Sequence, residues 1–319
     1  MTSRPAPAFS YSRLAGAALG TMCGDALGMP VEGWSAAEIE NKYGRLDRFV
    51  EGRLPAGSYT DDSQMMLAIL DTLAQRGGLD PAFLAGRFAA GYQPWRGYGG
   101  RIHQVMRQLA QGAAWDQVAT DSWGNGGAMR VGVLGVVYAH DEQACLRAAL
   151  DQCRITHTHP RALAGAAAQA LAVGLAARLG AQGKQADCAP FVAHVASLVE
   201  PIDAHTAARL RAMPRLARGD EAAARAVLTK EYACDVSASE AVPPALGAFL
   251  AAKSAEQAIV LAVSLGGDTD TIGAMAGALA GAHWGLEALP AAWVEGLENQ
   301  EAGRDHALSL CRRICGENG

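Results

Sequence analysis

The sequence predicts an all-α fold, built as a single compact domain of many helices. Apolar residues recur at helical spacing along most of the chain, strand-like alternation is hard to find, and no Pro/Ser-rich linker divides it. Of the 319 residues, 50% are hydrophobic and only 18% are charged, so the chain can bury a large core. An extended disordered protein is therefore excluded.

The expected helices follow one another along the whole chain. Residues 1–10 are expected to form a disordered lead, and residues 11–319 the single domain. Cap signals stand before two of the segments, with Asp80 preceding Pro81 and Ser254 preceding the segment after it. After the first helix, which starts close to the lead, Ala-rich amphipathic segments are expected at 64–76, 81–91, 99–111, 127–140, 142–153, 160–180, 187–199, 203–217, 219–232, 242–251, 254–264, 271–283 and 303–315.

Composition narrows the class of protein further. Lys and Arg number 27 against 32 Asp and Glu, a net charge of -5, which disfavours a nucleic-acid binder that neutralises phosphates. The 7 cysteines form no CxxC pair, so neither a disulfide framework nor a zinc knuckle is expected. No signal peptide and no apolar run of membrane-spanning length are evident. We expect a cytoplasmic monomer without a membrane partner.

Two acidic clusters, about 200 residues apart, share one design. Residues 60–63 read Thr-Asp-Asp-Ser and residues 266–271 read Gly-Gly-Asp-Thr-Asp-Thr, each before an apolar helical segment. Helix capping explains one carboxylate in each cluster but not the second, nor the paired glycines. If the clusters meet, their carboxylates repel unless cations lie among them, and such hard oxygen ligands suit Mg²⁺ or Mn²⁺. Metal binding and capping both stay open on residue types alone.

Two further acids lie between residues 24 and 33. Glu32, taken by itself, is typical of a solvated loop. Asp25 is expected to be structural and to hold loop amides. Neither residue identifies a reaction without its surroundings.

The motifs as a set resemble the (ADP-ribosyl)hydrolases of the dinitrogenase-reductase-activating-glycohydrolase type. The resemblance runs from about residue 12 to about residue 285, and it is carried by AGAALGTMCGDALGMPVE, GSYTDDSQM, GNGGAMRVG, Thr156-His157 and LGGDTDTIGAMAGALAGA. The segments WRGYGGRIHQVM and GNGGAMR are more similar to the branch that removes ADP-ribose from serine and cleaves poly(ADP-ribose). Tyr98-Gly99-Gly100 stands where the arginine-directed branch tends to carry an Asp.

The resemblance implies an all-α fold with two Mg²⁺ ions, or Mn²⁺, at the base of an ADP-ribose cleft. Glu32 is implied to contact the metal or to gate the cleft. It is the first choice for general acid or base, with Asp61, Asp62 and Asp268 as further catalytic candidates. The implied metal ligands are Thr60, Asp61, Asp62, Asp268, Asp270 and Thr271. The implied ADP-ribose contacts are Tyr98, Gly99, Trp123, Gly124, Asn125, Gly126, Gly127, Met129 and His157.

The expected function is Mg²⁺-dependent removal of ADP-ribose from modified protein side chains, with serine-linked substrates favoured. Water would attack C1 of the distal ribose, through an oxocarbenium-like state. Three alternatives stay open: an arginine-directed hydrolase, a hydrolase of O-acetyl-ADP-ribose or another conjugate, and a non-catalytic ADP-ribose-binding relative. The complete acidic set disfavours the last, because a degenerate relative is expected to lose carboxylates.

Overall fold

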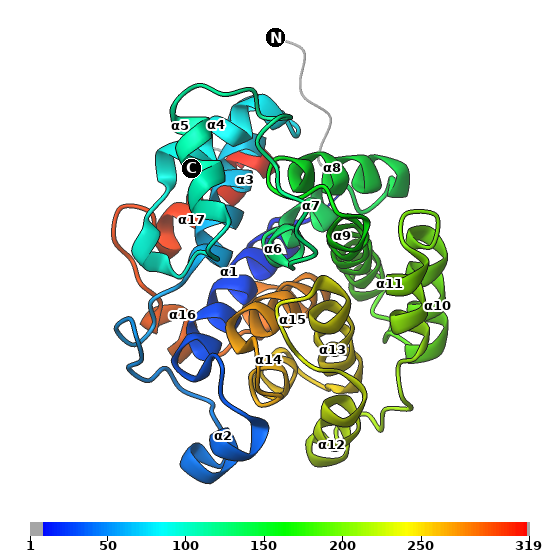
Figure 1. The fold of residues 1–319 in the computed structure, drawn as a ribbon. Helices are drawn as coiled ribbons and strands as arrows, with labels where there is room; N and C mark the ends of the chain where they lie inside the picture. Colours follow the sequence, from blue (N-terminus) through cyan, green and yellow to red (C-terminus); the bar gives the residue numbers. More distant parts are fainter. Residues whose placement is uncertain (1–8, 318–319) are drawn as a thin grey trace.

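Helices dominate residues 9–317, the part of the chain that this computed structural model describes (Figure 1). Within that range the all-α prediction is confirmed, and β-type pairing is limited to isolated bridges. Of the expected lead at 1–10, residues 1–8 lie outside the described residues. The α-helices are α1 (Tyr11–Gly28), α2 (Ala36–Tyr43), α3 (Asp61–Arg76), α4 (Pro81–Gly91), α5 (Ile102–Ala110), α6 (Gly126–Met129), α7 (Gly132–Val137), α8 (Glu142–Arg154), α9 (Pro160–Ala181), α10 (Cys188–Val199), α11 (Ala204–Arg211), α12 (Glu221–Glu231), α13 (Ala238–Ala251), α14 (Ala255–Val263), α15 (Thr269–Trp284), α16 (Ala291–Gly296) and α17 (Arg304–Cys315), with short 3₁₀ turns η1 (Met29–Val31), η2 (Pro94–Arg96) and η3 (Leu286–Ala288).

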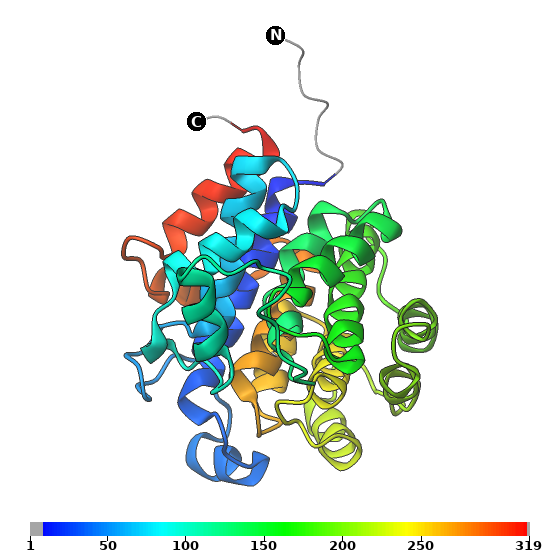
Figure 2. The same ribbon diagram turned by 45° about the horizontal axis from the view of Figure 1, so that its top comes forward.

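The centre of the fold is an antiparallel contact between α1 and α15, which lie side by side in Figures 1 and 2. Glycines at every fourth position of α1 face glycines of α15. A Cβ atom placed on Gly20 would lie 2.1 Å from the Gly277 carbonyl oxygen, and one on Gly24 would lie 2.0 Å from that of Gly273. Only glycine permits this backbone approach. The register brings the C-terminal end of α1 to the N-terminus of α15.

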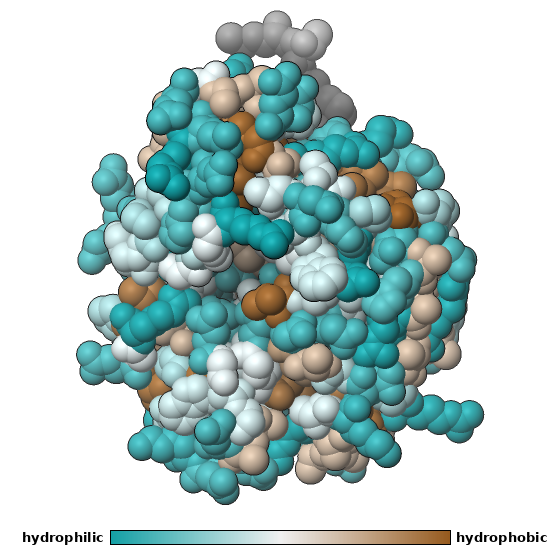
Figure 3. Space-filling model, viewed as in Figure 1, coloured by the Kyte–Doolittle hydropathy of each residue, from teal (hydrophilic) through white to brown (hydrophobic). Residues whose placement is uncertain are grey.

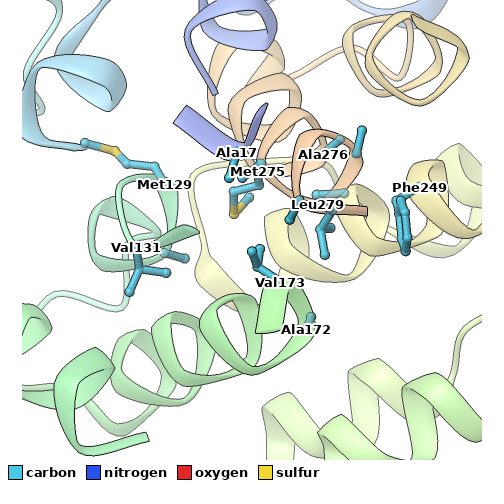
Figure 4. Packing of buried hydrophobic residues seen from close by; sticks show 14 of the residues in the cluster. Ala17, Met129, Val131, Ala172, Val173, Phe249, Met275, Ala276 and Leu279 are labelled. Carbon is cyan, nitrogen blue, oxygen red and sulfur yellow. The ribbon is translucent and has the colours of Figure 1, made fainter. Parts of the chain in front are cut away.

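Helices α9, α13 and α14 pack around α15 and complete the core. Figure 4 shows Met275 and Leu279 of α15 pointing toward Val173 of α9. All three side chains are fully buried. This packing fixes α15 from several sides, so its N-terminal acids sit on a rigid element.

Among the described residues, two helices are long and apolar enough to span a membrane by length and composition alone. They cover Tyr11–Val31 and Pro160–Ala181. Of the most apolar window in each, 94% and 78% of the residues are buried inside the fold. They are therefore placed as core helices, and their apolar character reflects packing against other helices.

Both cap signals are confirmed. The Phe83 amide donates to Asp80 Oδ1 at 3.0 Å, and the Gln257 amide donates to Ser254 Oγ at 3.1 Å. The short helices α2 and α16 were not predicted. At α2 a signal was present, because Ser35 and Glu38 form a capping box.

Three predicted helices differ most in extent. The segment 127–140 is wrong as one helix, because Arg130 and Val131 separate α6 from α7. The segment 203–217 ends at Arg211, since Pro214 disfavours helical backbone at the residue before it. The segment 242–251 begins four residues earlier, at Ala238, so that its two prolines lie inside α13.

Candidate active site

Six carboxylates gather where the ends of α1, α3 and α15 converge. The Thr269 hydroxyl donates to the Gly28 carbonyl at 2.9 Å and ties the start of α15 to the end of α1. Asp62 and Asp270, one from each cluster, have oxygens within 4.8 Å of each other. The two acidic clusters therefore meet, which is the condition that the sequence sets for a cation site. The six are Asp25, Glu32, Asp61, Asp62, Asp268 and Asp270.

Asp25 is fully buried and holds the first turn of α3. The Thr60 amide donates to both of its carboxylate oxygens, at 2.9 and 3.0 Å. The Ser63 amide and hydroxyl donate to Oδ2 at 3.0 and 2.6 Å. These bonds confirm the structural role expected for Asp25, and they fix the backbone from which the next two acids project.

Helix capping does not account for the side chains of Asp62 and Asp268. Thr60 is the N-cap of α3, and its Oγ1 accepts from the Asp62 amide at 3.4 Å and donates to Asp62 Oδ2 at 2.9 Å. At α15 the N-cap is Asp268, whose side chain makes no capping hydrogen bond. Its Oδ2 instead accepts from Asn125 Nδ2 at 2.6 Å. These two carboxylates are therefore available to the site.

The paired glycines before Asp268 are explained by close backbone contacts. Gly266 and Gly267 have φ angles of 78° and 74°, which disfavour other residues. The Gly33 amide donates to the Gly267 carbonyl and the Gly267 amide to the Trp34 carbonyl, both at 2.8 Å. This turn thereby joins the segment that carries Glu32 to the N-terminus of α15.

The residues present fit a pair of divalent cations. Asp62 is 2% exposed, and its Oδ1 has no hydrogen-bond partner among the described residues. A buried carboxylate oxygen without a partner is costly, and a cation would satisfy it. The carboxylates form two sets of three, and within each set one oxygen of every residue lies within 4.8 Å of the others. One set is Asp25, Asp62 and Asp270, and the other is Glu32, Asp268 and Asp270. All are hard oxygen donors.

Burial and mutual repulsion raise the pKa of these acids. Burial is the largest cause throughout, and neighbouring carboxylates add to it. The pKa of Asp25 and that of Glu32 are each raised to about 7. The pKa values of Asp61, Asp62 and Asp268 lie well above their usual range. Without positive charge nearby, the ionised cluster is therefore electrostatically unfavourable.

Arg53 supplies part of that positive charge. Its Nη2 donates to Glu32 Oε2 at 2.9 Å and lies 3.3 Å from Asp270 Oδ2. Nη1 donates to the Arg96 carbonyl at 3.3 Å. Arg96 is itself buried and pairs with Glu298 at 2.6 Å, which anchors the following loop.

A cavity of about 280 Å³ opens beside the carboxylates. A hollow near the middle of the face in Figure 3 lies in front of α1 and α6, framed mostly by hydrophilic side chains. One wall is the loop from residue 97 to residue 102, and the opposite wall runs from Thr120 to Arg130 with Thr156 and His157. The acids Glu32, Asp61, Asp62, Asp268 and Asp270 line it, together with Thr271.

Six of the nine expected ADP-ribose contacts line this cavity: Gly99, Gly124, Asn125, Gly126, Met129 and His157. His157 is 7% exposed, and its Nδ1 lies 2.7 Å from the Thr156 hydroxyl. Burial, with a smaller effect of Arg130, lowers the pKa of His157 to about 3. The imidazole is therefore neutral at physiological pH.

The other three expected contacts, Tyr98, Trp123 and Gly127, do not line the cavity, and neither does the expected metal ligand Thr60. The Tyr98 hydroxyl donates to Gln64 Oε1 at 2.7 Å. Trp123 is 55% exposed beside the cavity, with the Arg161 guanidinium 5.0 Å from its ring centre. A Cβ atom on Gly127 would lie 2.3 Å from Cys153 Sγ, so this glycine allows packing below the loop. Thr60 is fully buried and holds Asp62.

Sequence reasoning missed Arg53 and Arg101. Arg101 is exposed and lines the cavity, and within residues 9–317 no hydrogen bond or ion pair engages its side chain. No motif marks either arginine. Arg130 also lines the cavity, and its guanidinium donates to Gln152 Oε1 at 2.7 Å and to Thr156 Oγ1 at 2.8 Å.

Comparison with known proteins gives one family. The chain matches the ADP-ribosylglycohydrolase family over residues 6–319. It is 30% identical to "ADP-ribosylhydrolase ARH3" of Homo sapiens, with 95% of this chain and 94% of that one covered. It is 32% identical to an uncharacterized protein of Archaeoglobus fulgidus, covering 92% and 93%. A solved structure titled "ADP-ribosylglycohydrolase-related protein complex" superposes with a TM-score of 0.72 at 26% identity, covering 96% and 98%.

Proposed function

The chain belongs to the ADP-ribosylglycohydrolase family and is a glycosidic-bond hydrolase, and on that premise we propose that it removes ADP-ribose from serine side chains in a Mg²⁺-dependent reaction. The single observation that carries the metal part is the buried, unpartnered Oδ1 of Asp62 among the gathered acids. Two ions, Mg²⁺ or Mn²⁺, are proposed to be held among Asp61, Asp62, Asp268, Asp270 and Thr271, with Asp25 and Glu32 completing the two carboxylate sets. Thr60, whose hydroxyl donates to Asp62 Oδ2, is proposed to position that ligand.

The bond to be broken joins C1 of the distal ribose to the modified side chain. Its cleavage needs a positioned water on one face and stabilisation of the leaving group on the other. Mg²⁺ held by these acids would act as a Lewis acid toward water and the ribose hydroxyls. Glu32 lies at the cavity edge with its side chain 41% exposed, and it is proposed to act as the general acid or base, while Arg53 holds its carboxylate in place.

The opposite wall suits the rest of the ligand. Gly124 and Gly126 have no side chain between the cavity and the backbone, so a diphosphate can approach the chain closely. His157 is neutral and bonded on one nitrogen, which leaves the other available as a hydrogen-bond partner. Exposed Trp123 offers a ring on which a base or sugar can stack.

The charge of the 97–102 wall favours serine over arginine as the linkage. Between Gly97 and Ile102 the wall carries no carboxylate to pair with a guanidinium leaving group. It presents the cation of Arg101 instead, which would repel one. This is the observation that ranks the serine-linked substrate first.

The decisive experiment measures release of free ADP-ribose from serine-linked and arginine-linked ADP-ribosyl peptides, each with Mg²⁺ and with EDTA. Metal-dependent release from the serine peptide alone is expected. Release from the arginine peptide alone would contradict the linkage while keeping the reaction type. Equal release with EDTA would contradict the metal dependence.

Divalent cations are expected to stabilise the protein more at pH 8 than at pH 5.5. The pKa of Asp25 and that of Glu32 rise from 3.8 and 4.5 to about 7, so the folded metal-free protein holds protons that the unfolded chain releases. The metal-free stability from these groups is therefore greatest below pH ~4 and is lost as pH rises toward 7. Divalent cations bind the ionised acids and therefore restore this stability above pH 7.

Thermal denaturation with saturating Mg²⁺ and with EDTA checks this pH dependence. A Mg²⁺ concentration of about 100 times Kd adds about 2.7 kcal/mol, enough to raise Tm by several degrees at pH 8. The increase should shrink at pH 5.5, where protons compete for the same oxygens. An increase of the same size at both pH values would contradict the prediction.

Arg101→Gln is expected to raise KM about tenfold and to leave kcat within about twofold, because an exposed guanidinium aids binding of an anionic substrate without touching the reacting bond. The matched control is Arg107→Gln, inside helix α5, which begins directly after Arg101; Arg107 lies outside the cavity, so this variant should change neither KM nor kcat. Steady-state kinetics at low and high salt make the test. A KM that stays unchanged at low salt would show that Arg101 does not contact the substrate.

A further inference from the structure

The guanidinium of Arg53 lies on the oxygens of one of the two carboxylate sets. It contacts Glu32 Oε2 at 2.9 Å and Asp270 Oδ2 at 3.3 Å, and both residues belong to the set completed by Asp268. The Asp270 side chain is only 4% exposed, so water screens this contact poorly. The other set shares Asp270 with this one, but among the described residues no cation pairs with its other members, Asp25 and Asp62, and Asp62 Oδ1 stays without a partner.

We propose that Arg53 is an internal competitor for the divalent cation that Glu32, Asp268 and Asp270 can hold, which makes this set the weaker of two cation sites. The inference rests on the proposed metal dependence and adds the order in which the two cation sites fill. The set that contains Asp62 fills first, and the set that faces Arg53 fills second.

Two physical effects lead to this order. A guanidinium that donates to a carboxylate occupies a lone pair that a cation would otherwise use. Its positive charge also repels a dication brought within a few ångströms, and the burial of Asp270 limits how far water screens that repulsion. The second cation must therefore share Asp270 with Arg53 or displace the guanidinium.

The displacement has a consequence for Glu32. Among the described residues, Arg53 is the cation that pairs with the Glu32 carboxylate at the cavity edge. A guanidinium pushed from Asp270 would loosen or redirect that contact. Occupation of the second site would then be coupled to the position of the proposed proton-exchanging group.

The test is a titration of Mn²⁺ into the full-length, EDTA-treated protein, followed by calorimetry and by the electron paramagnetic resonance signal of free Mn²⁺. The wild type is expected to bind one ion more tightly than the other. In Arg53→Gln the weaker ion should bind about tenfold more tightly or better. Arg53→Lys keeps the charge and should remain close to the wild type.

The matched control is Arg45→Gln, which also removes an arginine that contacts several carboxylates, those of Glu221 at 2.6 Å, Glu256 at 3.0 Å and Asp47 at 3.6 Å. It lies outside the cavity and should leave both Mn²⁺ affinities unchanged. Two bound ions with equal affinities in wild type and Arg53→Gln would overturn the inference alone. A wild type that binds no Mn²⁺ would overturn the metal dependence and the inference together.

Discussion

Asp62→Asn lowers kcat/KM for an ADP-ribosylserine peptide by at least about 10³-fold, on the function proposed above, while the fold is retained. The substitution keeps the shape of the side chain. It removes the anionic oxygens, one of which is buried without a partner at the junction of the two acidic clusters. The loss should appear mainly in kcat, because the ligand-binding wall across the cavity is untouched.

Stability separates this result from simple misfolding. Burial together with Asp25 and Asp270 raises the pKa of Asp62, so its ionised form is unfavourable in the folded protein. Neutral Asn relieves that repulsion, and Tm in EDTA should stay unchanged or rise. The Tm increase caused by Mg²⁺ should shrink or vanish.

A second aspartate of α3 serves as the matched control. Asp71 is 6% exposed, lies outside the active-site cavity and pairs with Arg87 at 2.5 Å. Asp71→Asn should lower Tm and leave kcat/KM within about threefold, the reverse of the pattern at Asp62. If Asp62→Asn kept activity within tenfold of the wild type, the proposed metal-ligand role of Asp62 would be wrong.

Sequence reasoning located the acids well because their signal is local. Asp61, Asp62, Asp268 and Asp270 stand at helix N-termini beside residues with strong conformational preferences, and the structure places all four at one cavity. That the clusters meet depends on the glycine contact between α1 and α15. The glycine spacing was visible, but the pairing of those two helices was not.

Residues whose role depends on side-chain direction could not be predicted in this way. Tyr98 follows a loop glycine and precedes cavity residues, yet its hydroxyl donates to Gln64. Arg53 lies in a loop without a motif, and only the tertiary fold brings it to Glu32 and Asp270. The helix break at Arg130 coincides with a buried guanidinium that donates to the Gln152 side chain and carbonyl, contacts that hydrophobic periodicity does not reveal.

The close contact between α1 and α15 leads to the largest expected effect on stability. Gly24→Ala should lower the free energy of unfolding by about 3 kcal/mol or more, because overpacking against backbone atoms cannot be relieved by a rotamer change. The added Cβ would lie 2.0 Å from the Gly273 carbonyl oxygen and 2.2 Å from its carbon. The two helices must separate, which also moves Asp25 away from the start of α3.

Gly86→Ala is the matched control, since Gly86 also lies inside a helix, α4, and an added Cβ would meet nothing within 4 Å. Alanine has the higher helix propensity, so this variant should be neutral or more stable by up to about 1 kcal/mol. Urea denaturation of both variants in EDTA measures the difference without a contribution from cations. Equal stability of the two variants would mean that α1 and α15 tolerate separation, and the rigid placement of the acidic clusters would then need another source.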